Sequence, residues 1–251
     1  MSNFMQGIVF MRKQTLLRIS LPPNAHLYPS RFRELLAKEV ARNQLPWTLL
    51  HSSDQGIPLP GMPGVRVVGG HRWLGLLADE AHTPLLYQAM GSAVQAVTQM
   101  LGANASVEVE QRELSLTPLQ TPERYWIREM VLKRRSPAAR NSDLEELAQR
   151  RLVSGIERMA RQYGIDCPTQ EQLGIVVSVR RNLGLQLSTT NGPTSEWVTL
   201  VDMEFMIHAK LGGYWFAGNL TSRGYGRIGR NLAQLAVNFD LEQNKQRRFA
   251  A

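Results

Sequence analysis

Residues 65–78, VRVVGGHRWLGLLA, decide the fold of the first half of the chain. The segment contains two short runs, 65–68 and 73–78, rich in the apolar residues that are typical of β-strands. Gly69 and Gly70 lie between these runs, and paired glycines mark a turn. The stretch therefore predicts two adjacent strands joined by a short connection.

Two helices and two further strands are expected around this hairpin. Residues 30–43 and 84–101 carry apolar side chains at helical spacing, so each predicts an amphipathic helix. Residues 7–21 predict a strand that stops at a proline pair, and residues 106–116 alternate as a strand should. The order strand, helix, strand, strand, helix, strand is that of the ferredoxin-like unit.

The second half predicts a less regular α+β domain. The segment TPLQTP at residues 117–122 is expected to join the halves, which gives domains at 1–118 and 119–251. A helix is expected over residues 142–163, beginning at the capping box SDLE that Ser142 opens. Strands are expected at residues 124–133, 174–179, 184–188, 197–211 and 214–220.

The composition points to an anionic partner. The chain has 251 residues, of which 43% are hydrophobic, with a net charge of +8 and an isoelectric point near 10.1. Its 29 basic residues are 24 Arg and 5 Lys. Arginine presents a rigid fork that matches phosphate, so the bias favours nucleic acid. A GC-rich genome is an alternative cause of the same bias.

Several other classes of protein are not expected. The single cysteine, Cys167, excludes a disulfide framework and fits a reducing cytoplasm. The first ten residues do not resemble a signal peptide, and no run approaches about 18 apolar residues, so we expect a cytoplasmic protein without a membrane span. No DxD or HxxxH pattern is present, and we expect neither a metal nor another cofactor.

Basic residues gather on and before the predicted helix 142–163. A helical wheel places Leu144, Ala148, Leu152, Ile156, Met159 and Tyr163 on one arc, and Arg150, Arg151, Arg158 and Arg161 on the other. Arg134, Arg135 and Arg140 precede the helix. Such a face predicts contact with a phosphate backbone. An ordinary solvated surface is the alternative, because three glutamates lie among the arginines.

The segment GNLTSRGYGRIGR at residues 218–230 is the most informative candidate site. Its glycines let the backbone approach a ligand and adopt positive φ angles. Interleaved arginine and tyrosine offer phosphate contacts and a stacking surface. The residues expected to contact RNA are Arg223, Gly224, Gly226, Arg227, Gly229 and Arg230. A plain glycine-rich hairpin without a ligand is the structural alternative.

Residues 205–230, FMIHAKLGGYWFAGNLTSRGYGRIGR, resemble the closing motif of the CRISPR repeat-processing endoribonucleases. These enzymes belong to the repeat-associated RNA-binding superfamily. The resemblance implies two ferredoxin-like (RRM-like) domains in tandem with a C-terminal glycine-rich loop. The arginine-rich helix is similar to the helical insertion of the type IV branch, here at about residues 136–166, which is thought to hold the repeat hairpin.

The resemblance also implies a metal-independent reaction, in which a ribose 2′-hydroxyl attacks the adjacent phosphate and leaves a 2′,3′-cyclic phosphate. In many members a His or Tyr near the first helix does acid–base work, but the first predicted helix here contains no His. The nearest candidates are His26 and Tyr28 on the loop before it. His26 is as well explained as a solvated loop residue, and Tyr28 as a packing residue.

Arginines offer a second route to catalysis. Arg18 is expected on the strand face opposite Leu17 and Ile19, and Arg31 and Arg33 flank the apolar stripe of the first helix. Arginine does not act as a base at neutral pH, but it stabilises negative charge in a transition state. The alternative is that Arg18 is an ordinary surface residue of the strand.

The leading hypothesis is an endoribonuclease that cuts CRISPR repeat transcripts beside a hairpin and stays bound to the crRNA, together with other subunits of a CRISPR ribonucleoprotein. One alternative is a non-catalytic crRNA-binding subunit of such a complex. Another, from a different class, is an unrelated basic protein that binds DNA or the ribosome.

Overall fold

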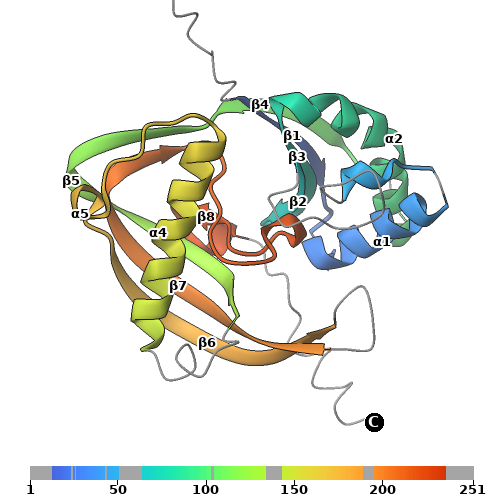
Figure 1. Ribbon diagram of the computed structural model, residues 1–251. Coiled ribbons are helices and arrows are strands. Elements are labelled where there is room, and N and C mark those ends of the chain that lie inside the picture. The colour runs from blue at the N-terminus through green and yellow to red at the C-terminus, as the bar shows by residue number, and fades with distance from the viewer. Residues whose placement is uncertain are drawn as a thin grey trace, which may run out of the picture.

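The computed structural model describes residues 13–23, 25, 27–42, 44–50, 64–102, 105–133, 143–188 and 195–235. Two antiparallel four-stranded sheets face each other, each with its own helices (Figure 1). The strand order is β2-β3-β1-β4 in the first sheet and β6-β7-β5-β8 in the second. This is the α+β arrangement of tandem ferredoxin-like domains that the sequence predicted.

The first sheet contains β1 (Lys13–Ser20), β2 (Val65–Gly70), β3 (Trp73–Asp79) and β4 (Val107–Glu113). Its helices are α1 (Pro29–Ala41) and α2 (Thr83–Leu101), with 3-10 turns η1 (Trp47–Leu49) and η2 (Glu80–His82). Both helices cover one face of the sheet, where Leu17 and Ile19 pack in one core with Phe32, Leu36 and Leu86. The predicted order of elements in the first half is confirmed.

The second sheet contains β5 (Ser115–Leu132), β6 (Val176–Ser188), β7 (Ser195–Gly212) and the short β8 (Ile228–Gly229). Its helices are α4 (Leu144–Gln162) and α5 (Gln170–Leu173), and the 3-10 turns η3 (Thr221–Arg223) and η4 (Leu232–Gln234) follow β7. Helix α4 is amphipathic as predicted: Ala148, Leu152, Ile156 and Met159 are fully buried. Its first turn is capped by Asp143, whose carboxylate accepts from two backbone N–H groups; Ser142 lies outside the described residues.

Three predicted boundaries in the second half are wrong. Residues 117–122 and 124–133 form a single strand, β5, which pairs with β7 from Ser115 onward. Residues 174–179 and 184–188 likewise belong to one strand, because a bulge after Val179 lets β6 bend without ending. Residues 214–220 are not a strand and make only isolated bridges. The domain limits 1–118 and 119–251 stay predictions.

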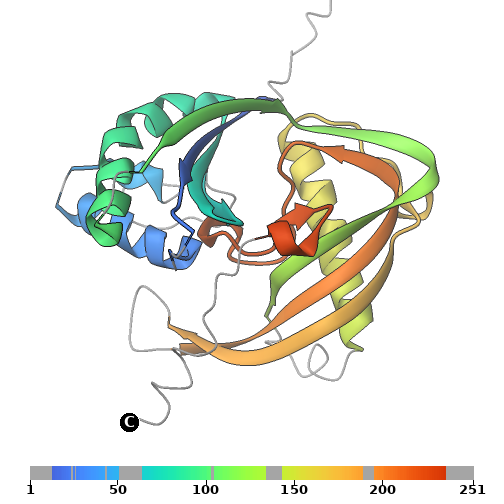
Figure 2. The same cartoon turned by 180° about the vertical axis from the view of Figure 1, so that it is seen from behind.

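One hydrophobic core joins the two sheets. The face of the first sheet that the helices leave uncovered contributes Leu16, Val68 and Trp73. They share a cluster with residues of β5, β7 and α4 and with the buried side chains of residues 214–217. Figures 1 and 2 both show the chain after β7 lying between the sheets. The glycine-rich segment therefore begins inside this shared core.

Within the described ranges, none of the helices is both long enough and apolar enough to cross a lipid bilayer.

Candidate active site

The glycine-rich segment, residues 218–230, has a backbone that requires glycine at several points. Gly218, Gly224 and Gly226 have φ angles of 85°, 90° and 69°, as the sequence predicted. A Cβ at Gly226 would also overlap the carbonyl oxygen of Ala217. That overlap follows from a tight return of the chain, in which the Ala217 N–H donates to the Gly226 carbonyl at 2.9 Å. The segment is thus folded back on residues 215–217.

The returning segment lies against the first half of the chain. Its 3-10 turn η3 contacts β2, an edge strand of the first sheet, and helix α1. Beyond η3, Ile228 and Gly229 form β8 and pair with Ile127 and Trp126 of β5. The segment therefore bridges the two sheets, and its side chains reach elements of both.

Arg33 and Arg223 come together where η3 meets α1. Arg33 is 9% exposed, and its Nη2 donates to the Leu50 carbonyl at 3.2 Å. Burial, followed by the nearby charge of Arg223, lowers the pKa of Arg33 to about 10. In the described part of the chain its buried Nε has no hydrogen-bond partner. A desolvated guanidinium on α1 that is influenced by the charge of Arg223, on the adjoining η3, would favour an anion at this junction.

Tyr225 is buried beside this pair. Its ring packs with Val131, Val198 and Leu200, and it is 4% exposed. Burial first, and then the charge of Glu129, raise the pKa of its hydroxyl, which stays protonated at neutral pH. The expectation that the tyrosine of this segment offers a stacking surface is therefore wrong, because the ring is covered by a small core of its own.

A stack of alternating arginine and aromatic side chains lies between the sheets. The guanidinium of Arg18 is 5.5 Å from the Trp73 ring centroid, and that of Arg227 is 5.2 Å from the same ring. Arg227 also lies 5.8 Å from the Tyr214 ring, which Arg112 approaches to 5.2 Å. We call these five residues the arginine–aromatic stack. Each contact combines cation–π attraction with burial of apolar surface.

Arg227 is held tightly within the stack. Its Nη2 donates to the Gln234 carbonyl at 2.9 Å. Burial lowers its pKa to about 10; the neighbouring Tyr214 opposes this shift and Arg112 adds to it. Arg18 is less buried and forms an ion pair with Glu110 at 3.3 Å. Arg227 therefore fixes the segment, while Arg18 keeps a side that faces solvent.

The predicted catalytic residues are distributed over two sides of the first sheet. Arg18 lies on the face turned to the second half, as strand alternation predicted, whereas Arg33 projects from α1 on the other side. Described contacts link Arg33 to Arg223, and Arg18 to Arg227 through Trp73. Arg31 is exposed and paired with Glu34 at 2.6 Å. The catalytic roles of these residues stay predictions.

Tyr28 immediately precedes α1 and is half-buried. His26 lies outside the described residues, as do Arg134, Arg135 and Arg140. Of the two acid–base candidates, the structure therefore places only Tyr28, at the start of α1.

The arginine face of α4 is exposed and reaches the segment at one point. Arg150, Arg151, Arg158 and Arg161 are all exposed, opposite the buried arc of the helix. The Nη2 of Arg158 donates to the Gly218 carbonyl at 3.4 Å. Burial, and then the charges of Arg66 and Arg151, lower its pKa. Arg158 thus connects the arginine face of α4 to the start of the glycine-rich segment.

Arg230, the last residue of the segment, holds the end of the segment against β5 of the second sheet. Its Nη2 pairs with Glu123 at 2.7 Å, and its guanidinium lies 5.7 Å from the Tyr125 ring. Since Arg230 is exposed, it can still meet a ligand at its outer side.

Sequence reasoning missed Arg66, Arg112 and the two aromatic members of the stack. Arg66 is fully buried in β2, with its guanidinium 5.4 Å from the Phe216 ring. Its register opposite Leu77 places it on the same face as Leu16, and this alternation was the available signal. Among the residues that the structure describes, no group of three or more His, Cys, Asp or Glu side chains is arranged to hold a metal ion.

Comparison with known families identifies the chain. Residues 11–232 match the family described as type IV CRISPR-associated endonuclease Csf5. The chain belongs to the Csf5 family. That match covers both sheets, α1, α4 and the glycine-rich segment, so it confirms the family that the closing motif suggested and the type IV branch that the arginine-rich helix suggested.

Solved structures agree with this Csf5 assignment. One described as Csf5, CRISPR-Cas type IV Cas6 crRNA endonuclease, is 36% identical with a TM-score of 0.76, covering 87% of this chain and 99% of its own. A crystal structure of Cas6b is 15% identical with a TM-score of 0.56, covering 87% of this chain and 100% of its own, and shows a common fold. No curated protein matches the chain in sequence.

Proposed function

We propose that this Csf5-family protein cuts CRISPR repeat RNA beside a hairpin to give crRNA. The observation that carries the proposal is the pair formed by buried Arg33 and Arg223 at the glycine-rich segment. A desolvated guanidinium beside a second one would stabilise a phosphate more strongly than exposed arginines do, because fewer water molecules screen the charges. The 36%-identical relative described as a crRNA endonuclease supports RNA as the substrate.

The proposed reaction is a transesterification within the RNA. The 2′-oxygen attacks the neighbouring phosphorus and loses its proton, the bond from phosphorus to the 5′-oxygen breaks, and that oxygen gains a proton. The products are a 2′,3′-cyclic phosphate and a 5′-hydroxyl. Arg33 and Arg223 would stabilise the charge that develops on the phosphoryl oxygens, a role that needs neither a metal nor a base. Arg18, which projects from β1 on the other face of the first sheet, would act in the same way on RNA that lies along that face.

The exposed arginines of α4 would hold the repeat hairpin. Four guanidinium groups on one helix face contact phosphates without reading bases, so they would supply affinity and position the RNA. This surface does not change when the strand is cut, which explains the proposed retention of crRNA within a ribonucleoprotein that contains other subunits.

One observation favours a non-catalytic crRNA-binding subunit as second candidate. Arg33 already donates to the Leu50 carbonyl, and Arg18 is engaged by Glu110 and Trp73. Residues held in this way would equally fix the fold around bound RNA.

Incubation with the cognate repeat RNA in EDTA separates the two candidates. The proposed function requires cleavage in EDTA, a cyclic phosphate on the upstream product, and no cleavage when the ribose before the cut is replaced by deoxyribose. Loss of cleavage in EDTA with recovery in Mg²⁺ would contradict the mechanism. Tight binding without cleavage under any condition would support the non-catalytic subunit.

A further inference from the structure

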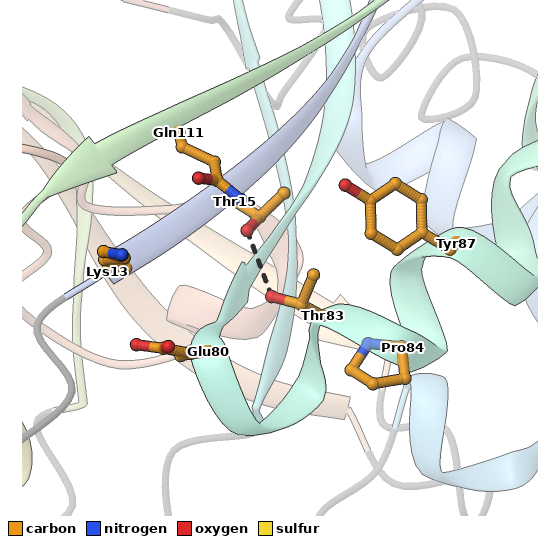
Figure 3. Close-up of a pocket in the computed structure, with 7 residues that line it drawn as sticks. All are labelled: Lys13, Thr15, Glu80, Thr83, Pro84, Tyr87 and Gln111. Carbon is orange, nitrogen blue, oxygen red and sulfur yellow. Dashed lines mark hydrogen bonds between the residues drawn. The ribbon is translucent and has the colours of Figure 1, made fainter.

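A pocket of about 560 Å³ lies at the start of α2, between β1 and β4 (Figure 3). It is lined by Lys13, Thr15, Glu80, Thr83, Pro84, Tyr87 and Gln111. None of these residues belongs to the glycine-rich segment, the arginine–aromatic stack or the arginine face of α4. The pocket opens on the side of the first sheet that carries the helices, so it is separate from the candidate active site.

Two threonines form a fixed polar floor. The hydroxyls of Thr15 and Thr83 are 3.0 Å apart, and the Thr83 hydroxyl donates to the Asp79 carbonyl at 3.1 Å. Since a hydroxyl has one proton, Thr15 is the donor to Thr83. The lone pairs of the Thr15 oxygen are therefore left as acceptors at the base of the pocket, although the residue itself is 2% exposed.

Three polar side chains converge on the pocket with their hydrogen-bonding capacity unused. In the described part of the chain, no hydrogen bond or ion pair involves the side chain of Lys13, Glu80 or Gln111. Lys13 and Glu80 lie on one side, while the Tyr87 ring stands on the opposite side beside Pro84. Tyr87 is 47% exposed, so its ring is accessible from solvent. A cation, a carboxylate, an amide and an aromatic wall thus face one volume.

We propose that this pocket binds a guanine base. The Tyr87 ring would stack on the base, as aromatic side chains do on unstacked nucleobases. The Glu80 carboxylate would accept from the N1–H and N2–H groups of guanine, which point the same way, and the Lys13 ammonium would donate to the adjacent O6. Gln111 would supply the remaining donor or acceptor.

The other bases fit this set less well. Adenine presents the acceptor N1 where guanine has a donor, so it would place a lone pair against the Glu80 carboxylate. Uracil has a single donor on that edge, flanked by two carbonyl oxygens. Cytosine offers its amino group to Glu80 but only an acceptor beside it. The preference for guanine therefore depends on Glu80, and the stacking depends on Tyr87.

Calorimetric titration of the full chain with the four nucleoside monophosphates tests the proposal. Guanosine monophosphate should bind tighter than adenosine monophosphate by about tenfold or more, the discrimination expected of one bidentate pair. Glu80→Gln should remove this preference. Glu171→Gln removes one negative charge from exposed α5, away from the pocket, and should leave the preference intact. Equal binding of all four bases, or an unchanged preference in Glu80→Gln, would overturn the proposal.

A second variant shows whether a loss of binding comes from the pocket or from unfolding of the protein. Tyr87→Leu should weaken every base alike without changing their order, while thermal melting shows that both variants are folded. Titration with the single-stranded RNA AAGAA separates two sources of the base. Binding at least about tenfold tighter than the mononucleotide, with this gain lost in Glu80→Gln, assigns the pocket to RNA, whereas equal affinity assigns it to a free nucleotide. Repeat RNA cleavage should be unchanged in Glu80→Gln, so the two proposals fail separately.

Discussion

Arg158 on α4 donates from Nη2 to the carbonyl of Gly218, at the start of the glycine-rich segment. This hydrogen bond joins the helix that carries the exposed arginines to the loop that approaches α1. It also distinguishes Arg158 from Arg151 and Arg161, for which no contact with the segment is seen in the described part of the chain. Experiments on the arginine face should therefore treat Arg158 separately.

Charge reversal at two exposed arginines of this face other than Arg158 should weaken RNA binding. In Arg150→Glu/Arg161→Glu, the hairpin should bind more weakly, and the slope of log K against log salt should fall by roughly one for each phosphate that is no longer neutralised. Arg42→Glu/Lys210→Glu carries the same change of charge on exposed positions elsewhere and is the control. Filter binding at several salt concentrations measures both. Equal effects in the two double variants would mean that only net charge matters.

Replacement of Arg33 should slow cleavage and leave hairpin binding nearly intact. Arg33→Ala removes the buried guanidinium beside Arg223, and the loss should be on the order of a hundredfold, typical for one electrostatic stabiliser. Lys38→Ala is the matched control, because Lys38 is an exposed cation of the same helix. Single-turnover rates separate the variants. A parallel loss of binding in Arg33→Ala would make Arg33 an RNA-holding residue.

The buried charge of Arg33 should also appear in the pH dependence of stability. Its pKa in the folded protein is about 10, well below the ordinary value for arginine, so above about pH 10 the folded state loses this proton before the unfolded state does. The unfolded state then binds more protons, and stability attributable to Arg33 rises with pH. Urea unfolding at about pH 9 and about pH 11 should show wild type gaining relative to Arg33→Met. A constant difference would show that the charge is not desolvated.

Arg18 should act on the rate and not through stability alone. Arg18→Ala removes one guanidinium from the arginine–aromatic stack, costing about 0.5–2 kcal/mol of folding free energy, while the cut should slow on the order of a hundredfold. Arg112→Ala removes the other terminal guanidinium of the stack and is the control. Cleavage rates and melting temperatures of both variants show whether Arg18 acts on the reaction or only on stability. If both variants lose rate only in proportion to stability, Arg18 is a structural residue.

The return of the glycine-rich segment should not tolerate a side chain at residue 226. Gly226→Ala combines a φ of 69° with a Cβ that would overlap the Ala217 carbonyl oxygen. We expect a loss of about 1–3 kcal/mol or more, and loss of cleavage. Gly91→Ala in α2 meets no atom within 4 Å and should stabilise by about 0.5–1 kcal/mol. Chemical denaturation of the two variants provides the comparison.

The spacing of apolar residues predicted much of this fold, because a helix or strand that buries one face repeats apolar residues at a fixed spacing. The alternation around Leu17 placed Arg18 on the correct face, and the spacing of Leu152 and Ile156 placed the arginines of α4 outward. The same reasoning failed at residues 214–220, where apolar side chains are buried between two sheets without forming a strand. Hydrophobicity alone does not distinguish these two kinds of burial.

The site was less predictable, because its chemistry depends on contacts between distant segments. Arg33 looks like a flanking polar residue of α1, and only the approach of Leu50 and Arg223 makes it a buried cation. Tyr225 looks available for stacking until Val198 and Leu200 cover it. Both environments arise when the chain returns between the sheets, which no local pattern encodes.

The shared core between the sheets has a further consequence for the length of RNA that would be processed. Leu16 and Val68 pack in one cluster with the second half, and only Leu114 separates β4 from β5. Such an arrangement leaves little room for a hinge, so the α4 surface and the Arg33–Arg223 pair keep a constant spacing. Under the proposed function, the distance from the hairpin base to the cut would be constant, so base pairs added at the base of the stem would move the cut by the same number of nucleotides.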